Sequence, residues 1–224
     1  MFIINFILGH SFSNSGLKIS LKKYLLCIFI ISSYSFSSNV SATSILLLGD
    51  SLSASRGMSQ KEGWVHLLNI KFTEQKSAIK IINASISGET TAGGLARLGN
   101  ILAKKKVDYL LVELGGNDGL RGFPPTLIKN NLLQIIQLAK AKNIQILLMD
   151  IRIPPNYGMR YSKLFNTVFS QTAQEKNIIL LPFFIKDIAI RPELMQQDGI
   201  HPNKQAQPMI ANVMFKQLTR IIKE

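Results

Sequence analysis

Three residues that could together activate a nucleophile lie toward opposite ends of the chain. Ser51 stands in the segment GDSLS, and Asp198 and His201 stand three residues apart in the segment DGIHP. A serine hydroxyl is a weak nucleophile until a base removes its proton, and a third group must orient that base. Because one short loop supplies both His201 as the base and Asp198 as the orienting acid, the pattern predicts a serine hydrolase.

Each of these residues also has a simpler interpretation. Serine and aspartate commonly cap helices and turns, so Ser51 and Asp198 could serve only as caps. Asp150 and Asp187 are weaker alternatives to Asp198 as the orienting acid. His66 is a weaker alternative to His201 because it lies inside a predicted helix beside apolar residues, which is typical of a structural histidine.

Two further residues could stabilise the negative oxygen that forms when a serine attacks a carbonyl group. Gly88 in SISGET offers a backbone N–H with no side chain to block approach, and Asn117 in GGND offers a neutral amide donor. Ser51 itself is expected at a helix N-terminus, where backbone N–H groups and the positive end of the helix dipole would stabilise the same oxygen. Glycine and asparagine are also ordinary turn residues, so neither is specific by itself.

Apolar periodicity predicts a regular alternation of strands and helices. Continuous apolar runs predict buried strands, and apolar residues at helical spacing predict amphipathic helices. The expected strands are 44–48, 79–82, 107–114, 144–149 and 178–181, and the expected helices are 63–76, 94–104, 126–142, 161–176 and 204–223.

This alternation predicts an α/β fold with a five-stranded parallel sheet and helices on both faces. Ligands of such sheets bind beyond the carboxyl ends of the strands. Ser51, Gly88 and Asn117 each follow a different predicted strand. We therefore expect all three at the same edge of the sheet.

The first 42 residues have the features of a secretory signal peptide. Lys18, Lys22 and Lys23 precede an apolar run, and the segment ends in the small-x-small pattern Val40-Ser41-Ala42. We expect cleavage after Ala42, a single domain over 43–224, and a periplasmic or secreted bacterial enzyme. An uncleaved membrane anchor is the alternative.

The composition bears on cofactors and partners. The net charge is +13, and the single cysteine lies within the expected leader. A basic surface favours anionic partners, so transient contact with an anionic membrane is one expectation. No aromatic residues interleave a basic stripe, so nucleic acid is not expected; no metal-ligand or phosphate-loop motif occurs, so neither metal nor cofactor is expected. Nothing indicates an obligate partner, and we expect a monomer.

The combination of motifs resembles the SGNH, or GDSL-type, family of esterases and lipases. The four name-giving positions occur in the family's order at Ser51, Gly88, Asn117 and His201, with Asp198 beside the histidine. The resemblance covers nearly all of 44–222 and implies a flavodoxin-like three-layer α/β/α sandwich. It also implies a Ser51, His201 and Asp198 triad, and an oxyanion hole of the Ser51 and Gly88 amides with the Asn117 side chain.

Within that family the chain is similar to the thioesterase and lysophospholipase subgroup, in which a loop closes over the acyl chain. The matching substrate-binding residues here are Ile153, Pro154, Pro155, Asn156, Tyr157 and Gly158. True α/β-hydrolases are disfavoured because Ser53 stands where their G-x-S-x-G elbow has its second glycine.

The expected function is hydrolysis of acyl thioesters and carboxylic esters, including lysophospholipids, through an acyl-enzyme on Ser51. A carbohydrate or aryl-ester deacetylase on the same fold is the alternative enzyme. A lipid-binding module with an inactive site is the alternative outside catalysis.

Overall fold

The computed structural model describes residues 42–222. The expected signal peptide lies outside the described residues except for Ala42 itself. Strand β1 (Thr43–Gly49) follows directly after that residue.

The sheet has five parallel strands in the order β2-β1-β3-β4-β5. The other strands are β2 (Ile79–Asn83), β3 (Tyr109–Glu113), β4 (Gln145–Met149) and β5 (Ile179–Leu181). The central strands β1, β3 and β4 are buried along most of their length, as their continuous apolar runs predict. The expected α/β fold with a five-stranded parallel sheet is confirmed.

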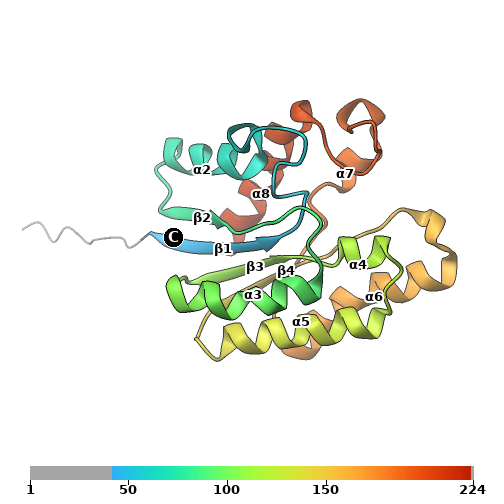
Figure 1. Ribbon diagram of the computed structural model, residues 1–224. Helices are drawn as coiled ribbons and strands as arrows, with labels where there is room; N and C mark the ends of the chain where they lie inside the picture. Colours follow the sequence, from blue (N-terminus) through green and yellow to red (C-terminus); the bar gives the residue numbers. More distant parts are fainter. Residues whose placement is uncertain (1–41, 223–224) are drawn as a thin grey trace, which may run out of the picture. The chain divides into compact units, whose positions relative to one another are not determined.

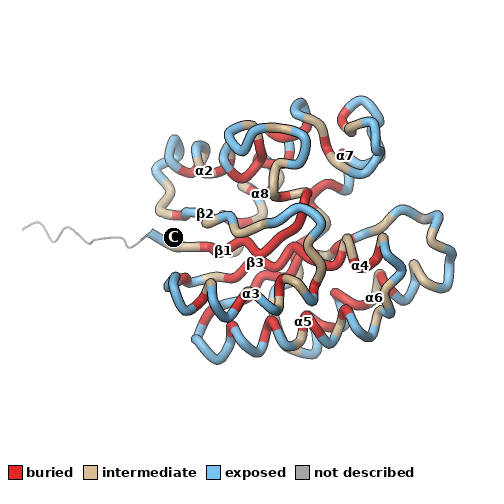
Figure 2. The backbone as a smooth tube through the Cα atoms, viewed as in Figure 1, coloured by how far each residue is buried: buried red, intermediate tan, exposed pale blue. Residues whose placement is uncertain are grey.

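Helices cover both faces of this sheet (Figure 1). On one face α2 (Trp64–Glu74) packs against α8 (Gln207–Ile221), and on the other lie α3 (Thr91–Lys104), α5 (Pro125–Lys140) and α6 (Met159–Lys176). The buried side of each long helix faces the strands, and its exposed side faces outward (Figure 2). The three layers enclose one apolar core between them.

Short helices occupy the connections and include two that the periodicity did not predict. These two are α4 (Gly116–Leu120) and α7 (Lys186–Ala189), at the carboxyl ends of β3 and β5. Single 3₁₀ turns lie at Gln60–Glu62, Pro155–Tyr157, Pro192–Leu194 and Lys204–Ala206. Elements this short contain too few residues to show a helical period.

Helix α3 starts at Thr91, three residues before the predicted start at 94. The Thr90 side chain caps this first turn and stabilises it although the turn contains Gly93 and Gly94. The Thr90 hydroxyl accepts a hydrogen bond from the Gly93 N–H at 3.1 Å. Gly94 is required by packing rather than by a turn, since a methyl group there would lie 2.3 Å from the buried Leu114 side chain. Within residues 42–222 no helix is both long enough and apolar enough to cross a bilayer.

Candidate active site

Ser51, His201 and Asp198 form a continuous hydrogen-bonded chain at the carboxyl edge of the sheet. The Ser51 Oγ lies 2.8 Å from the His201 Nε2, and the His201 Nδ1 lies 2.6 Å from the Asp198 Oδ2. Ser51 follows β1 by two residues and is 8% exposed, whereas the His201 side chain is 12% exposed. The two segments that the sequence separates by 150 residues therefore meet at one point.

The Asp198 carboxylate is held in its charged form. Partial burial alone would raise its pKa, but hydrogen bonds from the His201 and Ile200 amides, together with the imidazole, outweigh burial and lower the pKa to about 2. Both amides donate to Oδ1 at 3.0 Å, which leaves Oδ2 for the ring. A carboxylate held in this way can orient His201 and stabilise the imidazolium.

The loop that carries Asp198 and His201 is fixed by its own hydrogen bonds. The Gln196 N–H donates to the His201 carbonyl at 2.7 Å, and Met195 and Pro202 form an antiparallel bridge. The Asn203 side chain donates to the Glu193 carbonyl at 2.8 Å. Gly199 has a φ of 65°, a conformation in which glycine avoids the strain of a side chain.

Three candidate oxyanion donors lie around the same cavity. Ser51, Gly88 and Asn117 all line it. Within residues 42–222 the amides of Ser51 and Gly88 donate to no acceptor, so both are available to a ligand. The Asn117 Nδ2 donates one hydrogen to the Asp50 Oδ2 at 3.2 Å, which leaves a second hydrogen.

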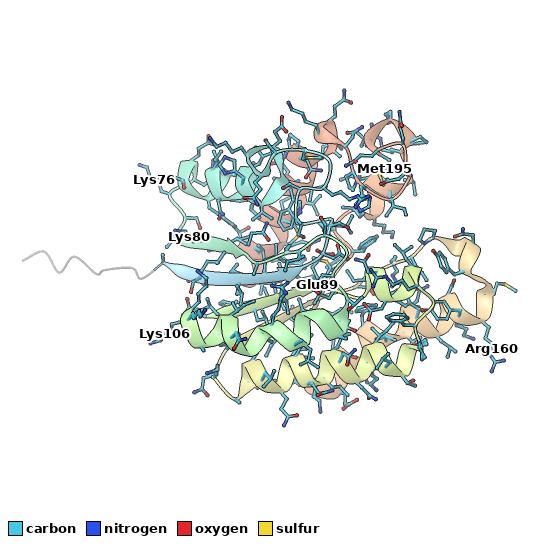
Figure 3. The ribbon with its side chains drawn as sticks, in the orientation of Figure 1. Lys76, Lys80, Glu89, Lys106, Arg160 and Met195 are labelled. Carbon is cyan, nitrogen blue, oxygen red and sulfur yellow. The ribbon has the colours of Figure 1, made fainter. Side chains whose placement is uncertain are left out.

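The cavity beside the serine has a volume of about 560 Å³ and is mostly apolar. Its apolar wall consists of Leu52, Leu120, Ile151, Ile153, Pro154, Phe183, Ile185, Ala189, Ile190, Met195 and Ile200. Figure 3 labels Met195 near this end of the molecule, far from Lys76, Lys80 and Lys106 at the other end of the sheet. A cavity of this size and character suits an apolar ligand group.

The structure brings some of the expected loop residues to the cavity and not others. Ile153 and Pro154 line it, whereas Asn156, Tyr157 and Gly158 are not part of the lining. Pro155 begins the 3₁₀ turn Pro155–Tyr157, which directly follows Pro154. The next helix is anchored by Tyr161, whose hydroxyl donates to the Phe123 carbonyl at 2.7 Å.

The alternative acids and the alternative histidine lie elsewhere. Asp150 forms an ion pair with Arg152, and Asp187 is exposed on α7. His66 is exposed on α2. Among residues 42–222 no group of three or more histidine, cysteine or acidic side chains could hold a metal ion.

Two features at the site were not found from the sequence. One is a pair of buried acids, Asp50 and Glu113, beneath Ser51 and Asn117. The other is a set of three cations that line the cavity, Arg56, Arg152 and Lys186, of which only Arg152 forms an ion pair within the described residues. The sequence marks the two acids only as acidic residues at the ends of apolar runs, Asp50 in ILLLGD and Glu113 in LLVELGG.

Comparisons with known proteins agree with this arrangement. Residues 47–207 match the model of the GDSL-like lipase/acylhydrolase family. Thioesterase 1/protease 1/lysophospholipase L1 of Escherichia coli strain K12 is 49% identical over 181 residues, which cover 81% of this chain and 86% of that protein. An arylesterase of Vibrio mimicus is 44% identical over 176 residues, covering 79% of this chain and 88% of the relative.

A solved structure shows the same fold at similar identity. The psychrotrophic esterase EstA from Pseudoalteromonas sp., inhibited by monoethylphosphonate, has a TM-score of 0.80 and 47% identity. The match covers 81% of this chain and all of the EstA chain. The family model alone spans more than half of the sequence, and this chain therefore belongs to the GDSL-like lipase/acylhydrolase family, as its motifs indicated.

Proposed function

We propose that this protein is a serine hydrolase that cleaves acyl thioesters and carboxylic esters, lysophospholipids among them, through an acyl-enzyme on Ser51. The observation that carries the proposal is the hydrogen-bonded chain from Ser51 through His201 to Asp198, at the wall of an apolar cavity. The names of the relatives, which include thioesterase, lysophospholipase and arylesterase, support the same reaction class.

The first half of the proposed reaction forms the acyl-enzyme. The Ser51 Oγ attacks the carbonyl carbon while the His201 Nε2 takes the hydroxyl proton, and Asp198 stabilises the resulting imidazolium. The carbonyl oxygen becomes an oxyanion that accepts hydrogen bonds from the Ser51 and Gly88 amides and from the Asn117 Nδ2. The tetrahedral intermediate then collapses: the bond to the leaving thiol or alcohol breaks, and His201 returns the proton to that group.

The second half releases the acid. A water molecule gives a proton to the His201 Nε2 and attacks the acyl carbon, and the same donors hold the second oxyanion. The bond to the Ser51 Oγ breaks, His201 returns the proton to the serine, and the carboxylic acid leaves. The proposed mechanism assigns no step to a metal or cofactor.

The cavity favours long acyl groups over acetyl as substrates. An acetyl group would leave most of a cavity of about 560 Å³ unfilled, whereas a longer chain buries its methylenes against the apolar wall. Each buried methylene contributes roughly 0.8 kcal/mol. Arg56 and Lys186 add two unpaired cations to the lining, which suits the phosphate of a lysophospholipid or of a phosphorylated thiol carrier.

Location and assembly are part of the same proposal. We propose that residues 1–42 are removed as a signal peptide and that the domain 43–224 acts in the periplasm or outside the cell. The start of β1 at Thr43, directly after the expected cleavage point, supports this boundary. We further propose a monomer that contacts anionic membranes only transiently.

Labelling with a fluorophosphonate tests the proposed nucleophile. The probe should modify the wild-type protein once, with the adduct mapping to Ser51, and should not modify Ser51→Ala. Ser53→Ala is the matched control, because its hydroxyl is buried two residues away and donates to Glu113. An adduct on another residue, or equal labelling of Ser51→Ala, would contradict the proposal.

A further inference from the structure

Two acidic side chains are buried directly beneath the candidate site. Asp50 is 3% exposed and Glu113 is 1% exposed. They meet because β1 and β3 are neighbours in a register that pairs Gly49 with Glu113. A methyl group at Gly49 would lie 2.6 Å from the Glu113 Oε2, so a glycine here leaves the space that the carboxyl group occupies. The proposed mechanism uses neither acid directly.

The hydrogen bonds to Asp50 require an acceptor at both of its oxygens. The Leu52 N–H donates to Oδ1 at 3.0 Å, and the Asn117 Nδ2 donates to Oδ2 at 3.2 Å. A carboxylate accepts at both positions, whereas an asparagine has one acceptor atom and one donor atom. Both bonds favour the ionised form of Asp50, because hydrogen bonds to a charged acceptor are stronger than those to a neutral one.

Glu113 accepts hydrogen bonds at only one of its two carboxyl oxygens. Its Oε2 accepts hydrogen bonds from the Asp50 N–H at 3.2 Å and from the Ser53 Oγ at 2.7 Å. Its Oε1 is buried, and no N–H or O–H group of the described residues donates to it. Because the Asp50 N–H contacts Glu113 and both carboxyl groups are buried, ionising both acids would place two negative charges close together in the interior, so the pair retains a proton. We assign that proton to Glu113, because each oxygen of Asp50 accepts a hydrogen bond whereas the buried Glu113 Oε1 accepts none.

Electrostatics agrees with that assignment. Burial, and next the negative charge of Asp50, raise the pKa of Glu113 well above its usual range. Burial also raises the pKa of Asp50, but the hydrogen bonds from Leu52, Glu113 and Asn117 limit the rise to about 6. Asp118 on α4 is the other acid that acts on Asp50, and its charge raises that pKa further. Near neutral pH the pair therefore holds one proton and one negative charge.

We propose that a neutral Glu113 donates a hydrogen bond to an ionised Asp50, and that Asp50 in turn orients the Asn117 amide toward the oxyanion. Both acids are then positioning residues of the oxyanion hole, and this inference rests on the proposed role of Asn117. The contact from Asp50 Oδ2 fixes which end of the Asn117 amide is the donor. The proton on Glu113 limits the pair to one negative charge near the developing oxyanion.

The central experiment is a double-mutant cycle between Asp50 and Asn117, measured as kcat and KM on a neutral p-nitrophenyl acyl ester. Asp50→Asn should lower kcat by about 10- to 100-fold with little change in KM. The reason is that an Asn117 amide that is no longer oriented loses part of the transition-state stabilisation that deleting the amide would remove. In the Asn117→Ala background, Asp50→Asn should lower kcat by less than about 3-fold, because the amide that Asp50 positions is already absent. Equal losses in both backgrounds, or no loss in the wild type, would overturn the inference.

Glu113→Gln provides the conservative rescue. Its carbonyl oxygen can accept from the Asp50 N–H and Ser53 Oγ, and its NH₂ can donate to the Asp50 carboxylate, so it reproduces the neutral acid. We expect kcat within about 3-fold of wild type for Glu113→Gln and a loss of at least about 10-fold for Glu113→Leu, which has no donor. A Gln variant as inactive as the Leu variant would show that the glutamate must be charged and would overturn the inference.

The pH dependence of stability tests the proton without measuring activity. A buried acid whose pKa is raised on folding loses stability as pH rises above its usual pKa, because the unfolded chain ionises first. Glutamine has no such loss, so the unfolding temperature of Glu113→Gln should rise relative to wild type between about pH 5 and about pH 8. A difference in unfolding temperature that stays constant over this pH range would overturn the assignment of the proton to Glu113.

Failure of the proposed function itself would look different: the wild-type enzyme would show no Ser51-dependent hydrolysis.

Discussion

At the scale of single residues, the candidate site depends on the protonation states of its acidic side chains. Asp198 is held ionised by two amides and the His201 ring, so it can act on the histidine only as a charged acceptor. The spacing of these two residues made them recognisable in the sequence, because the turn that joins them is local. The pairing of Asp50 with Glu113 was not recognisable, because it depends on which strands are neighbours and in what register.

Asp198→Asn tests the role of the orienting acid. We expect kcat to fall by about 10⁴-fold with KM nearly unchanged, because an amide places the wrong hydrogen-bonding group against His201. Circular dichroism near neutral pH should remain close to wild type, which would show that the variant is folded. Activity within about 10-fold of wild type would contradict this role.

The same variant has a predicted pH dependence of stability. Because the pKa of Asp198 is lowered from 3.8 to about 2 in the folded protein, the carboxylate stabilises the fold above its usual pKa, and this contribution is lost as pH falls toward about 2. The difference in free energy of unfolding between wild type and Asp198→Asn should therefore shrink between about pH 5 and about pH 2. A difference that grows on acidification would contradict the hydrogen-bonding pattern at Asp198.

At the scale of elements, the periodic segments were predictable and the short connections were not. The continuous apolar runs gave each strand to within two residues of its observed ends, because burial on both faces leaves a clear pattern. The start of α3 was placed too late because Gly93 and Gly94 suppress the helical signal, while the cap at Thr90 acts through a single side chain. Helix α4, which carries Asn117, is too short for any periodicity.

Glycine replacements in β1 and α3 test whether packing or backbone freedom selects each glycine. Gly49→Ala should lower the free energy of unfolding by about 1–3 kcal/mol, because the new methyl group would lie 2.6 Å from the buried Glu113 carboxyl. Gly99→Ala is the matched control: the site is exposed on α3 with nothing within 4 Å, so stability should rise by roughly 0.5–1 kcal/mol. Chemical denaturation measures both. Equal effects would show that the contact at Gly49 is unimportant.

At the scale of the whole molecule, the positive charge is spread over both ends of the sheet. Lys76, Lys80 and Lys106 lie at the end away from the cavity (Figure 3), whereas Arg56 and Lys186 line it. The net charge of +13 therefore does not by itself identify the substrate-facing surface. The sequence predicted an anionic partner only in general terms, because the composition cannot say which cations meet in the fold.

Reversing one cavity charge tests whether the substrate is anionic. Lys186→Glu should raise KM for an anionic lysophospholipid by about 10-fold and leave kcat/KM for a neutral p-nitrophenyl ester within about 2-fold. Lys142→Glu makes the same charge change on an exposed residue before the amino end of β4, at the opposite edge of the sheet, and should have little effect on either substrate. Equal effects of the two variants would assign the change to net charge rather than to the cavity.

The central claim, a serine hydrolase of long acyl groups, is tested most directly by one comparison of substrates. The purified protein and Ser51→Ala would be given a long-chain acyl thioester, a lysophospholipid and a short acetyl ester. We predict that kcat/KM is higher for the two long-chain substrates and that Ser51→Ala lowers kcat by at least about 10³-fold. Turnover of the acetyl ester alone would contradict the proposed substrate class, and full activity of Ser51→Ala would contradict the mechanism.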